Sequence, residues 1–254
     1  MVPEWPAPAR VGALCTTRTG GVSAPPFDSL NLGDHVGDDP AAVTANRQKL
    51  SEALAVRPVF LHQVHGWEVL ALDAATADGS VADGCLTRTP ALACTVLVAD
   101  CLPVLFCDRA GTTVAAAHAG WRGLAGSGGR GVLEETVARF CAAADIGPAE
   151  IGAQTLVWLG PCIGPQAFQV GPEVKAAFEA HHPQASRFFV PAGAGKWLAD
   201  LPGMARQRLA ALGVTAVYGN DGGALWCTVG NLSRFFSHRR DGRSGRFAAS
   251  VWLR

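Results

Sequence analysis

Three short segments each place a metal-competent side chain beside an apolar stretch. The segments are HQVHG with His62, Gln63 and His65, VADCLPV with Asp100 and Cys101, and AAAHAGWRG with His118, Trp121 and Arg122. A thiolate and two imidazoles form a good ligand set for zinc, and three protein ligands leave the fourth coordination position open, as in catalytic sites. The sequence therefore indicates a candidate catalytic metal site, and the spacing alone does not choose between His62 and His65.

Each of these residues also has an ordinary structural explanation. A single histidine is more often a hydrogen-bonded core or surface residue than a ligand, which is how we interpret His35, His181, His182 and His238. Cys101 follows an acid and precedes a proline, but an inert buried thiol fits the same pattern. Asp100 could be a general base, a partner that orients a ligand histidine, or a carboxylate that bonds a turn.

A possible anion site follows the third segment. Arg122 and the glycine-rich run from Gly120 to Gly131 precede a stretch with helical periodicity. Backbone N–H groups at a helix start bind anions well, so this turn could cradle one. The alternative is that the glycines only permit a tight turn.

The composition narrows the class of protein. The chain has 254 residues, with 21 Lys+Arg against 21 Asp+Glu, and this balance is not typical of a nucleic-acid-binding protein. Hydrophobic residues make up 49% of the chain and charged residues 17%, which predicts a large core. No apolar run reaches the roughly 18 residues of a membrane helix, and none resembles a signal peptide. We therefore expect a cytoplasmic protein without a membrane partner, whose eight cysteines are thiols.

The elements that must position these residues do not follow a regular strand–helix period. Helices are expected at 40–54, 132–144, 172–180 and 201–212. Strands are expected at 59–61, 69–72, 94–99, 104–107, 112–117, 155–159 and 248–253. Two or three adjacent buried strands are expected among those at 94–99, 104–107 and 112–117. This pattern predicts a single α+β domain over residues 1–254, with mixed β-sheets flanked by helices, rather than a doubly wound sheet.

The motifs together are similar to those of the YfiH family. They are TTRTGGVSAPPFDSLNLGDHVGDDPAAVTANR, HQVHG, ADCLPV, HAGWRGL, GPCIGPQAFQVG and CTVGNLSRFFSHRRDGRSGRFAASVWL, in this order from Thr16 to Leu253. The family is also called laccase-like multicopper polyphenol oxidoreductase, purine nucleoside phosphorylase and peptidoglycan editing factor. The resemblance implies a fold similar to the cytotoxic necrotizing factor domain. It also implies zinc ligands at His65, Cys101 and His118, which favours His65 over His62.

The resemblance also implies a reaction. Family members similar to this chain are described as zinc enzymes that cleave adenosine, inosine, guanosine or methylthioadenosine with phosphate, and that deaminate adenosine. Catalytic roles are expected for Cys101, His118 and Asp100. Substrate binding is expected for Gln63, Arg122, Arg47, Arg239 and Arg240, and base stacking for Trp121 or Phe27. The expected partners are a purine nucleoside and phosphate, bound by a monomer.

Two other activities remain as alternatives. One is an amide hydrolase that removes misincorporated serine from muramyl precursors of the cell wall, with Cys101 as nucleophile and His118 as base when no metal is bound. The other is a copper phenol oxidase, which is less favoured because such enzymes need many more histidine ligands. Zinc is accordingly the expected ion, with copper second. The chain departs from the usual family motifs at Cys162, Gln169 and His238, which leaves its substrate preference open.

Overall fold

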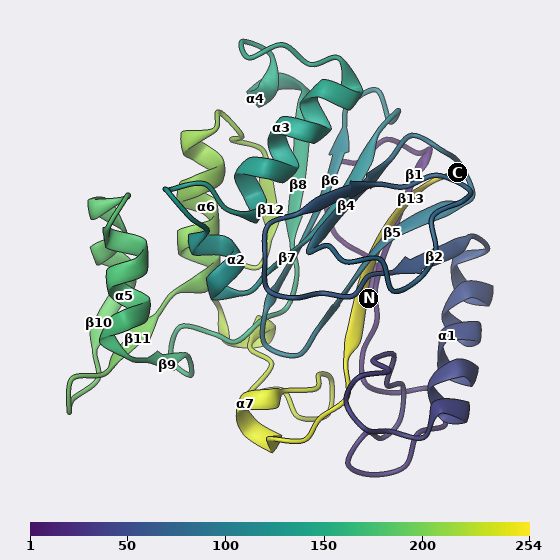
Figure 1. Cartoon of the computed structure of the whole chain (residues 1–254), viewed down its shortest axis with the longest axis horizontal. Coiled ribbons are helices and arrows are strands. Elements are labelled where there is room, and N and C mark those ends of the chain that lie inside the picture. The colour runs from purple at the N-terminus through teal and green to yellow at the C-terminus, as the bar shows by residue number, and fades with distance from the viewer.

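Two β-sheets packed face to face form the centre of the molecule (Figure 1), in a computed structural model that describes residues 1–254. The first sheet has the order β1 (Val11–Cys15), β13 (Phe247–Leu253), β5 (Leu92–Val98) and β2 (Arg57–Phe60). The second has the order β12 (Val217–Gly219), β8 (Thr155–Leu159), β6 (Leu102–Asp108), β7 (Val114–Ala119), β4 (Gly84–Thr87) and β3 (Val69–Ala71). Parallel and antiparallel pairs occur in both, so the sheets are mixed as predicted.

A third, smaller sheet lies to one side of the central pair. It consists of β10 (Phe189–Pro191), β11 (Trp197–Ala199) and β9 (Gln169–Val170), and helix α5 (Pro172–Glu179) packs beside it (Figure 1). The 3-10 helix η1 (Pro183–Phe188) leads into β10, and a second one, η2 (Ala224–Trp226), follows β12. Two further helices, α4 (Ile151–Gln154) and α7 (His238–Asp241), have only four residues each. None of the helices is both long and apolar enough to cross a bilayer.

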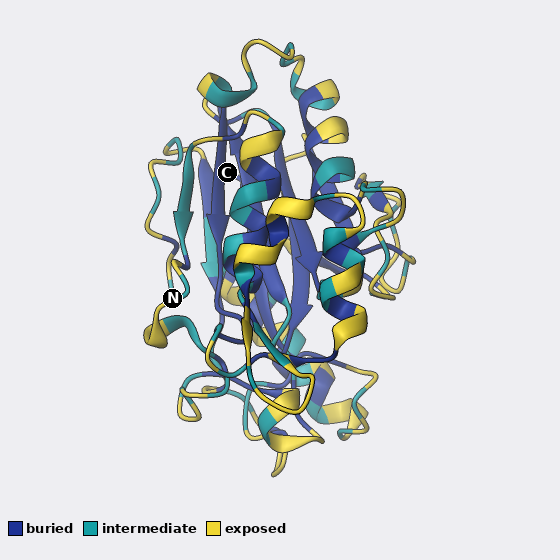
Figure 2. Ribbon diagram, turned by 90° about the vertical axis from the view of Figure 1, so that its left-hand side faces the viewer, coloured by how far each residue is buried: buried dark blue, intermediate teal, exposed yellow.

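Alternating side chains sort the strands into layers. On β5, Cys94, Val96 and Val98 face the core between the two sheets, whereas Ala93 and Leu97 face outward. That outer face is covered by α1 (Pro40–Leu54). The outer face of the second sheet packs against α2 (Trp121–Ala125), α3 (Val132–Ala144) and α6 (Leu201–Ala211). Strands β4 to β8 are buried throughout. Figure 2 shows the central strands in the buried colour and the helices with exposed residues on their outer sides.

Local sequence explains where the two longest helices begin. Asp39 caps α1 by accepting a hydrogen bond from the Ala41 backbone N–H at 3.0 Å, and Pro40 suits the first helical position. Helix α3 carries Glu134 and Glu135 in its first turn, where acidic side chains interact favourably with the helix dipole. Both helices have the bounds that the sequence predicts.

The α+β class is confirmed, and two of the three central apolar strands are adjacent. Strands β6 and β7 are neighbours as predicted, but β5 belongs to the other sheet. Residues 99–101 carry the chain from one sheet to the other, so that the continuous apolar stretch contributes to two layers. Strands β1, β4 and β9 to β12, and the short helices α2, α4 and α7, were not predicted, because each is short and lacks a clear period.

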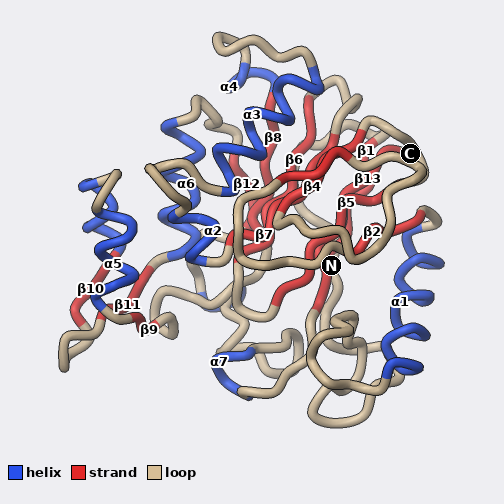
Figure 3. Tube along the Cα trace, in the orientation of Figure 1, coloured by secondary structure: helices blue, strands red, loops and turns tan.

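Long loops gather at one end of the two sheets. Figure 3 shows loop segments and α7 at this end, where the chain before α1 meets the chain before β13. Backbone hydrogen bonds join Arg18 to Arg234, and Leu32 to Arg246. The asparagine side chain of Asn31 is fully buried and bonds Gly33, Asp38 and the backbone N–H of Arg246. Specific hydrogen bonds therefore hold the loop of residues 16–39 against the C-terminal segment.

Candidate metal centre

The three predicted ligands come from separate segments and meet at this loop-rich end. His65 lies in the loop between β2 and β3, Cys101 directly precedes β6, and His118 lies near the end of β7. Their ligand atoms all lie within 4.8 Å of one another, and Nε2 of His65 is 3.6 Å from Sγ of Cys101. His62 does not belong to this cluster: its side chain is exposed, and its backbone forms an isolated β-bridge with Val81. The structure thus brings together His65, Cys101 and His118.

A fully buried carboxylate, that of Asp83, lies behind the cluster. Asp83 Oδ1 is 2.8 Å from Nδ1 of His118. The same carboxylate accepts hydrogen bonds from three consecutive backbone N–H groups, those of Val64, His65 and Gly66. Asp83 was not among the predicted site residues. The only local signal is an acid among apolar neighbours at the start of a short strand.

Close backbone approach brings the cluster together. His65 has a φ of 61°, in the left-handed region that non-glycine residues rarely adopt. A Cβ atom on Gly120 would lie 2.7 Å from Cδ2 of His65 and 3.0 Å from Sγ of Cys101, so only glycine fits there. Gln63 holds the same loop to β5, because its amide pairs with both the N–H and the carbonyl of Leu97 at 2.8 Å.

The cysteine and the buried histidine shift each other's protonation. Burial alone raises the pKa of the Cys101 thiol, but the charge of His118 and contacts with both histidines outweigh it and lower the pKa to about 6. Burial alone lowers the pKa of His118, but the Cys101 thiolate and Asp83 raise it to about 9. Without metal, the pair is therefore a thiolate and an imidazolium near neutral pH.

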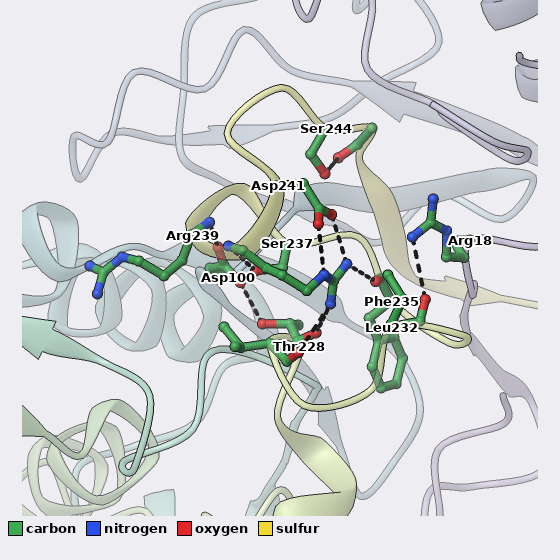
Figure 4. Close-up of polar contacts among 12 residues, drawn as sticks. Arg18, Asp100, Thr228, Leu232, Phe235, Ser237, Arg239, Asp241 and Ser244 are labelled. Carbon is green, nitrogen blue, oxygen red and sulfur yellow. Dashed lines mark hydrogen bonds and ion pairs between the residues drawn. The ribbon is translucent and has the colours of Figure 1, made fainter. Parts of the chain in front are cut away.

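The Asp100 carboxylate is already engaged in the protein. One oxygen accepts a hydrogen bond from the Thr228 hydroxyl, and the other accepts one from the Arg239 backbone N–H at 2.7 Å (Figure 4). The φ of Asp100 is 92°, again in the left-handed region. Asp100 therefore ties the segment before β6 to the C-terminal loops, and it lines the cleft described next.

A cleft of about 350 Å³ opens over the three ligands. Its apolar lining consists of Leu97, Val98, Ala99, Ile163 and Phe168, and its polar lining includes Gln63, Asp100, His35, His238, Arg239 and Arg246. His35 and His238 are exposed, as expected, but both border this cleft. Arg239 is the one predicted arginine on the cleft. Arg246, which sequence analysis did not select, is a second.

The other predicted arginines are held elsewhere. Arg47 pairs with Asp34 at 3.2 Å and lies over the ring of Phe60. Arg240 is bound by Asp241 and by the carbonyls of Thr228, Val229 and Phe235. Arg122 is exposed and stacks on Trp121. None of these arginines lines the cleft.

The aromatic and glycine candidates also lie off the cleft. Phe27 is buried and contacts Arg243, and Trp121 contacts Arg122, so neither lines the cleft. The ring of Phe168 does. The glycine-rich run forms a tight turn with positive φ at Gly126, Gly128 and Gly129, and the helix start that follows is closed by Glu134, which accepts from the Gly131 N–H at 2.8 Å.

Two of the three departures from the family motifs concern the cleft. His238 lies on its border, and the backbone carbonyl of Gln169 accepts a hydrogen bond from Arg239 at 2.9 Å. Cys162 is buried, and burial raises the pKa of its thiol well above the usual value. Cys162 is therefore an ordinary core thiol, as expected.

The donor set fits a metal ion. Two imidazoles and a thiolate within 4.8 Å of one another match the ligand types of zinc, and three ligands leave an open position toward the cleft. The Asp83–His118 contact is the carboxylate–histidine pairing common at such sites. Two imidazoles and a thiolate also suit copper, but neither of the two methionines, Met1 and Met204, lines the cleft as an axial ligand.

Comparison with known proteins gives full-length matches. The family model described as multi-copper polyphenol oxidoreductase laccase matches residues 12–254. A purine nucleoside phosphorylase of Pseudomonas aeruginosa is 54% identical over 254 residues, covering 100% of this chain and 98% of that protein. The purine nucleoside phosphorylase YfiH of Escherichia coli is 50% identical over 255 residues, with the same coverage. A crystal structure of a Neisseria meningitidis protein has a TM-score of 0.91 at 46% identity, covering 100% of this chain and 98% of that one.

Proposed function

The chain belongs to the family described as multi-copper polyphenol oxidoreductase laccase, which includes YfiH, and we propose that it is a zinc-dependent purine nucleoside phosphorylase. Such an enzyme breaks the bond between a purine and its sugar and joins phosphate to the same sugar carbon. One observation carries the proposal: the His65–Cys101–His118 cluster lies in a cleft that also presents Arg239 and Arg246. The relatives' names support the same activity.

The metal would be held by His65, Cys101 and His118. A zinc ion bound by three protein ligands supplies a Lewis acid with an open coordination position. The low pKa of Cys101 keeps the thiol in the thiolate form that binds metal. Zinc as the ion, and adenosine deamination as a second activity of the site, are parts of this proposal.

Two arginines are suited to hold phosphate. Arg239 is fixed by the Gln169 carbonyl and by the ring of Phe168, whose centroid is 5.5 Å from the guanidinium carbon. Arg246 donates from one nitrogen to the carbonyls of Ser244 and Gly245. An arginine has five N–H donors, so both keep donors for an anion, and the guanidinium shape matches phosphate oxygens.

The apolar side of the cleft is suited to a purine. Phe168 can stack on a flat base, and Leu97, Val98 and Ile163 exclude water beside it. We also propose that the protein is a monomer and acts as one domain over residues 1–254. We propose the cytoplasm as its location and adenosine, inosine, guanosine and methylthioadenosine as its substrates.

Chromatography of adenosine and inosine incubated with the purified protein, with and without phosphate, tests the proposal. We expect free adenine and hypoxanthine only when phosphate is present. Arg246→Gln should raise the KM for phosphate by about 10–100-fold, because hydrogen bonds to charged groups contribute about 1.5–3 kcal/mol. Arg122→Gln, an exposed arginine off the cleft, is the matched control. Base release that is independent of phosphate would contradict the proposal.

A thiol hydrolase is a second candidate, which the Asp83–His118 contact favours. With no metal bound, Cys101 supplies a nucleophilic thiolate, His118 an imidazolium that can protonate the leaving amine, and Asp83 a carboxylate that orients this ring. A thiolate cannot be a metal ligand and a free nucleophile at once. Amide cleavage of a muramyl-serine substrate should therefore increase when metal is stripped. Cleavage that requires metal would exclude this mechanism.

A further inference from the structure

The Asp83 carboxylate contacts two of the three proposed metal ligands, His65 and His118. Asp83 Oδ1 accepts from the backbone N–H of His65 at 2.9 Å and lies 2.8 Å from Nδ1 of His118. Asp83 Oδ2 accepts from the N–H groups of Val64 at 3.1 Å and Gly66 at 2.7 Å. Each oxygen therefore has two partners, and the residue is fully buried.

The contact with His118 determines which ring nitrogen faces the cluster. A carboxylate next to Nδ1 favours the proton on that nitrogen, which leaves the lone pair on Nε2. The backbone N–H of His118 also donates to the Asp83 carbonyl at 2.7 Å. Both the ring and the backbone of this ligand are thus fixed by one residue.

The contact with the loop fixes the second ligand. His65 has a left-handed backbone, which is unfavourable for a residue with a Cβ atom. Three consecutive N–H groups point at the Asp83 carboxylate, and this concave arrangement stabilises a negative charge. The carboxylate therefore holds the loop in the conformation that brings His65 to Cys101.

We propose that Asp83 is a positioning residue that preorganises His65 and His118 together for metal binding, an inference that rests on the proposed metal site. Asp83 does not face the open coordination position and does not belong to the cleft lining. Its effect is on metal affinity and on the geometry of the bound ion. A purely structural carboxylate would change stability without changing either.

The chain offers a matched control in Asp108. Asp108 is also buried, and it accepts from the backbone N–H groups of Thr112 at 2.7 Å and Thr113 at 2.8 Å. It also accepts from the Thr112 hydroxyl at 2.8 Å. Asp108 ends β6, whereas Cys101 directly precedes the start of that strand. Replacing it with asparagine exchanges one acceptor oxygen for an NH2 group, as at Asp83, without touching the ligands.

The experiment compares Asp83→Asn and Asp108→Asn with the wild-type protein. Zinc affinity is measured by competition with a chromophoric chelator, and ligand geometry by the visible absorption of the cobalt-substituted proteins. We expect Asp83→Asn to weaken zinc binding about 10–100-fold, as is typical for loss of such a partner, and to alter the cobalt spectrum. Asp108→Asn should retain wild-type affinity and spectrum. Equal affinity in Asp83→Asn and wild type, or an equal loss in both variants, would overturn the proposal.

A second measurement applies even when Asp83→Asn does not fold. Long-range ¹H–¹⁵N NMR of the zinc-loaded wild-type protein should show His118 protonated at Nδ1 and without a proton at Nε2. A proton on Nε2 would refute the role of Asp83. Neither test uses nucleoside turnover, so absence of phosphorolysis would leave the proposed role of Asp83 unaffected. Absence of zinc binding by the wild type would refute the metal site itself.

Discussion

The two ends of the β6–β7 hairpin each have a cysteine and a nearby buried carboxylate, but the two cysteines differ in their electrostatic surroundings. Cys101 precedes β6 at one end and Cys107 lies near its other end. The pKa of Cys101 is lowered to about 6, whereas burial and the charge of Asp108 raise the pKa of Cys107 to about 12. A buried carboxylate accepts backbone hydrogen bonds at both ends.

The difference shows that burial alone does not determine reactivity. Burial raises the pKa of both thiols, and the neighbouring charge decides the outcome. An imidazolium lies beside Cys101, and a carboxylate lies beside Cys107. The carboxylate of Asp83, in turn, bonds an imidazole, whereas that of Asp108 bonds only a turn. Cys101 is therefore a reactive thiolate at one end of the hairpin, whereas Cys107 at the other end is an unreactive core thiol.

Removing one thiol at a time should separate the two ends most strongly. Cys101→Ala should lower kcat/KM for phosphorolysis by more than about 1000-fold, the scale for a group that acts as part of a catalytic unit. Cys107→Ala should keep activity and lose only about 1–2 kcal/mol of stability, as for a small core truncation. Steady-state kinetics and thermal unfolding measure both. Full activity in Cys101→Ala would show that the metal site is misassigned.

Alkylation of the metal-free protein should distinguish the same two thiols by pH. At pH 7 iodoacetamide should modify Cys101 at least about 100-fold faster than Cys107, because the thiolate is the nucleophile. The lowered pKa means that Cys101 remains a thiolate as pH falls, until about 6, and that its rate declines below that value. Mass spectrometry of tryptic peptides gives the rates. A midpoint near pH 9 would contradict the assigned electrostatics.

Glycine substitutions give a smaller contrast between the ends. Gly120→Ala places a Cβ atom against His65 and Cys101 and should weaken zinc binding about tenfold, comparable to loss of a supporting group. Gly111 lies in the opposite turn with a φ of 65°. Gly111→Ala should cost about 1–2 kcal/mol of stability and leave zinc affinity unchanged. Chelator competition and urea unfolding measure the two effects, and weaker zinc binding in Gly111→Ala would remove the distinction.

The sequence predicts the long elements and the three ligands better than their supports. Helices α1 and α3 have strong capping and periodic signals, whereas β9 has only two residues. The three proposed metal ligands lie in motifs similar to those of the YfiH family. Asp83 contacts a ligand 35 positions away, and Arg246 meets the rest of the cleft only through the fold, so no local pattern marks either residue. Arg47 and Arg240 were expected to bind substrate, but the fold uses both guanidinium groups for bonds within the protein.

We propose that the metal cluster and the arginines of one cleft together carry phosphorolysis. The decisive experiment is ³¹P NMR of inosine incubated with phosphate and the purified protein, with metal content measured on the same sample. The expected result is ribose 1-phosphate formed in step with hypoxanthine, by protein that contains about one zinc per chain, as a single three-ligand site implies. Zinc-loaded protein that forms no ribose 1-phosphate would contradict the claim.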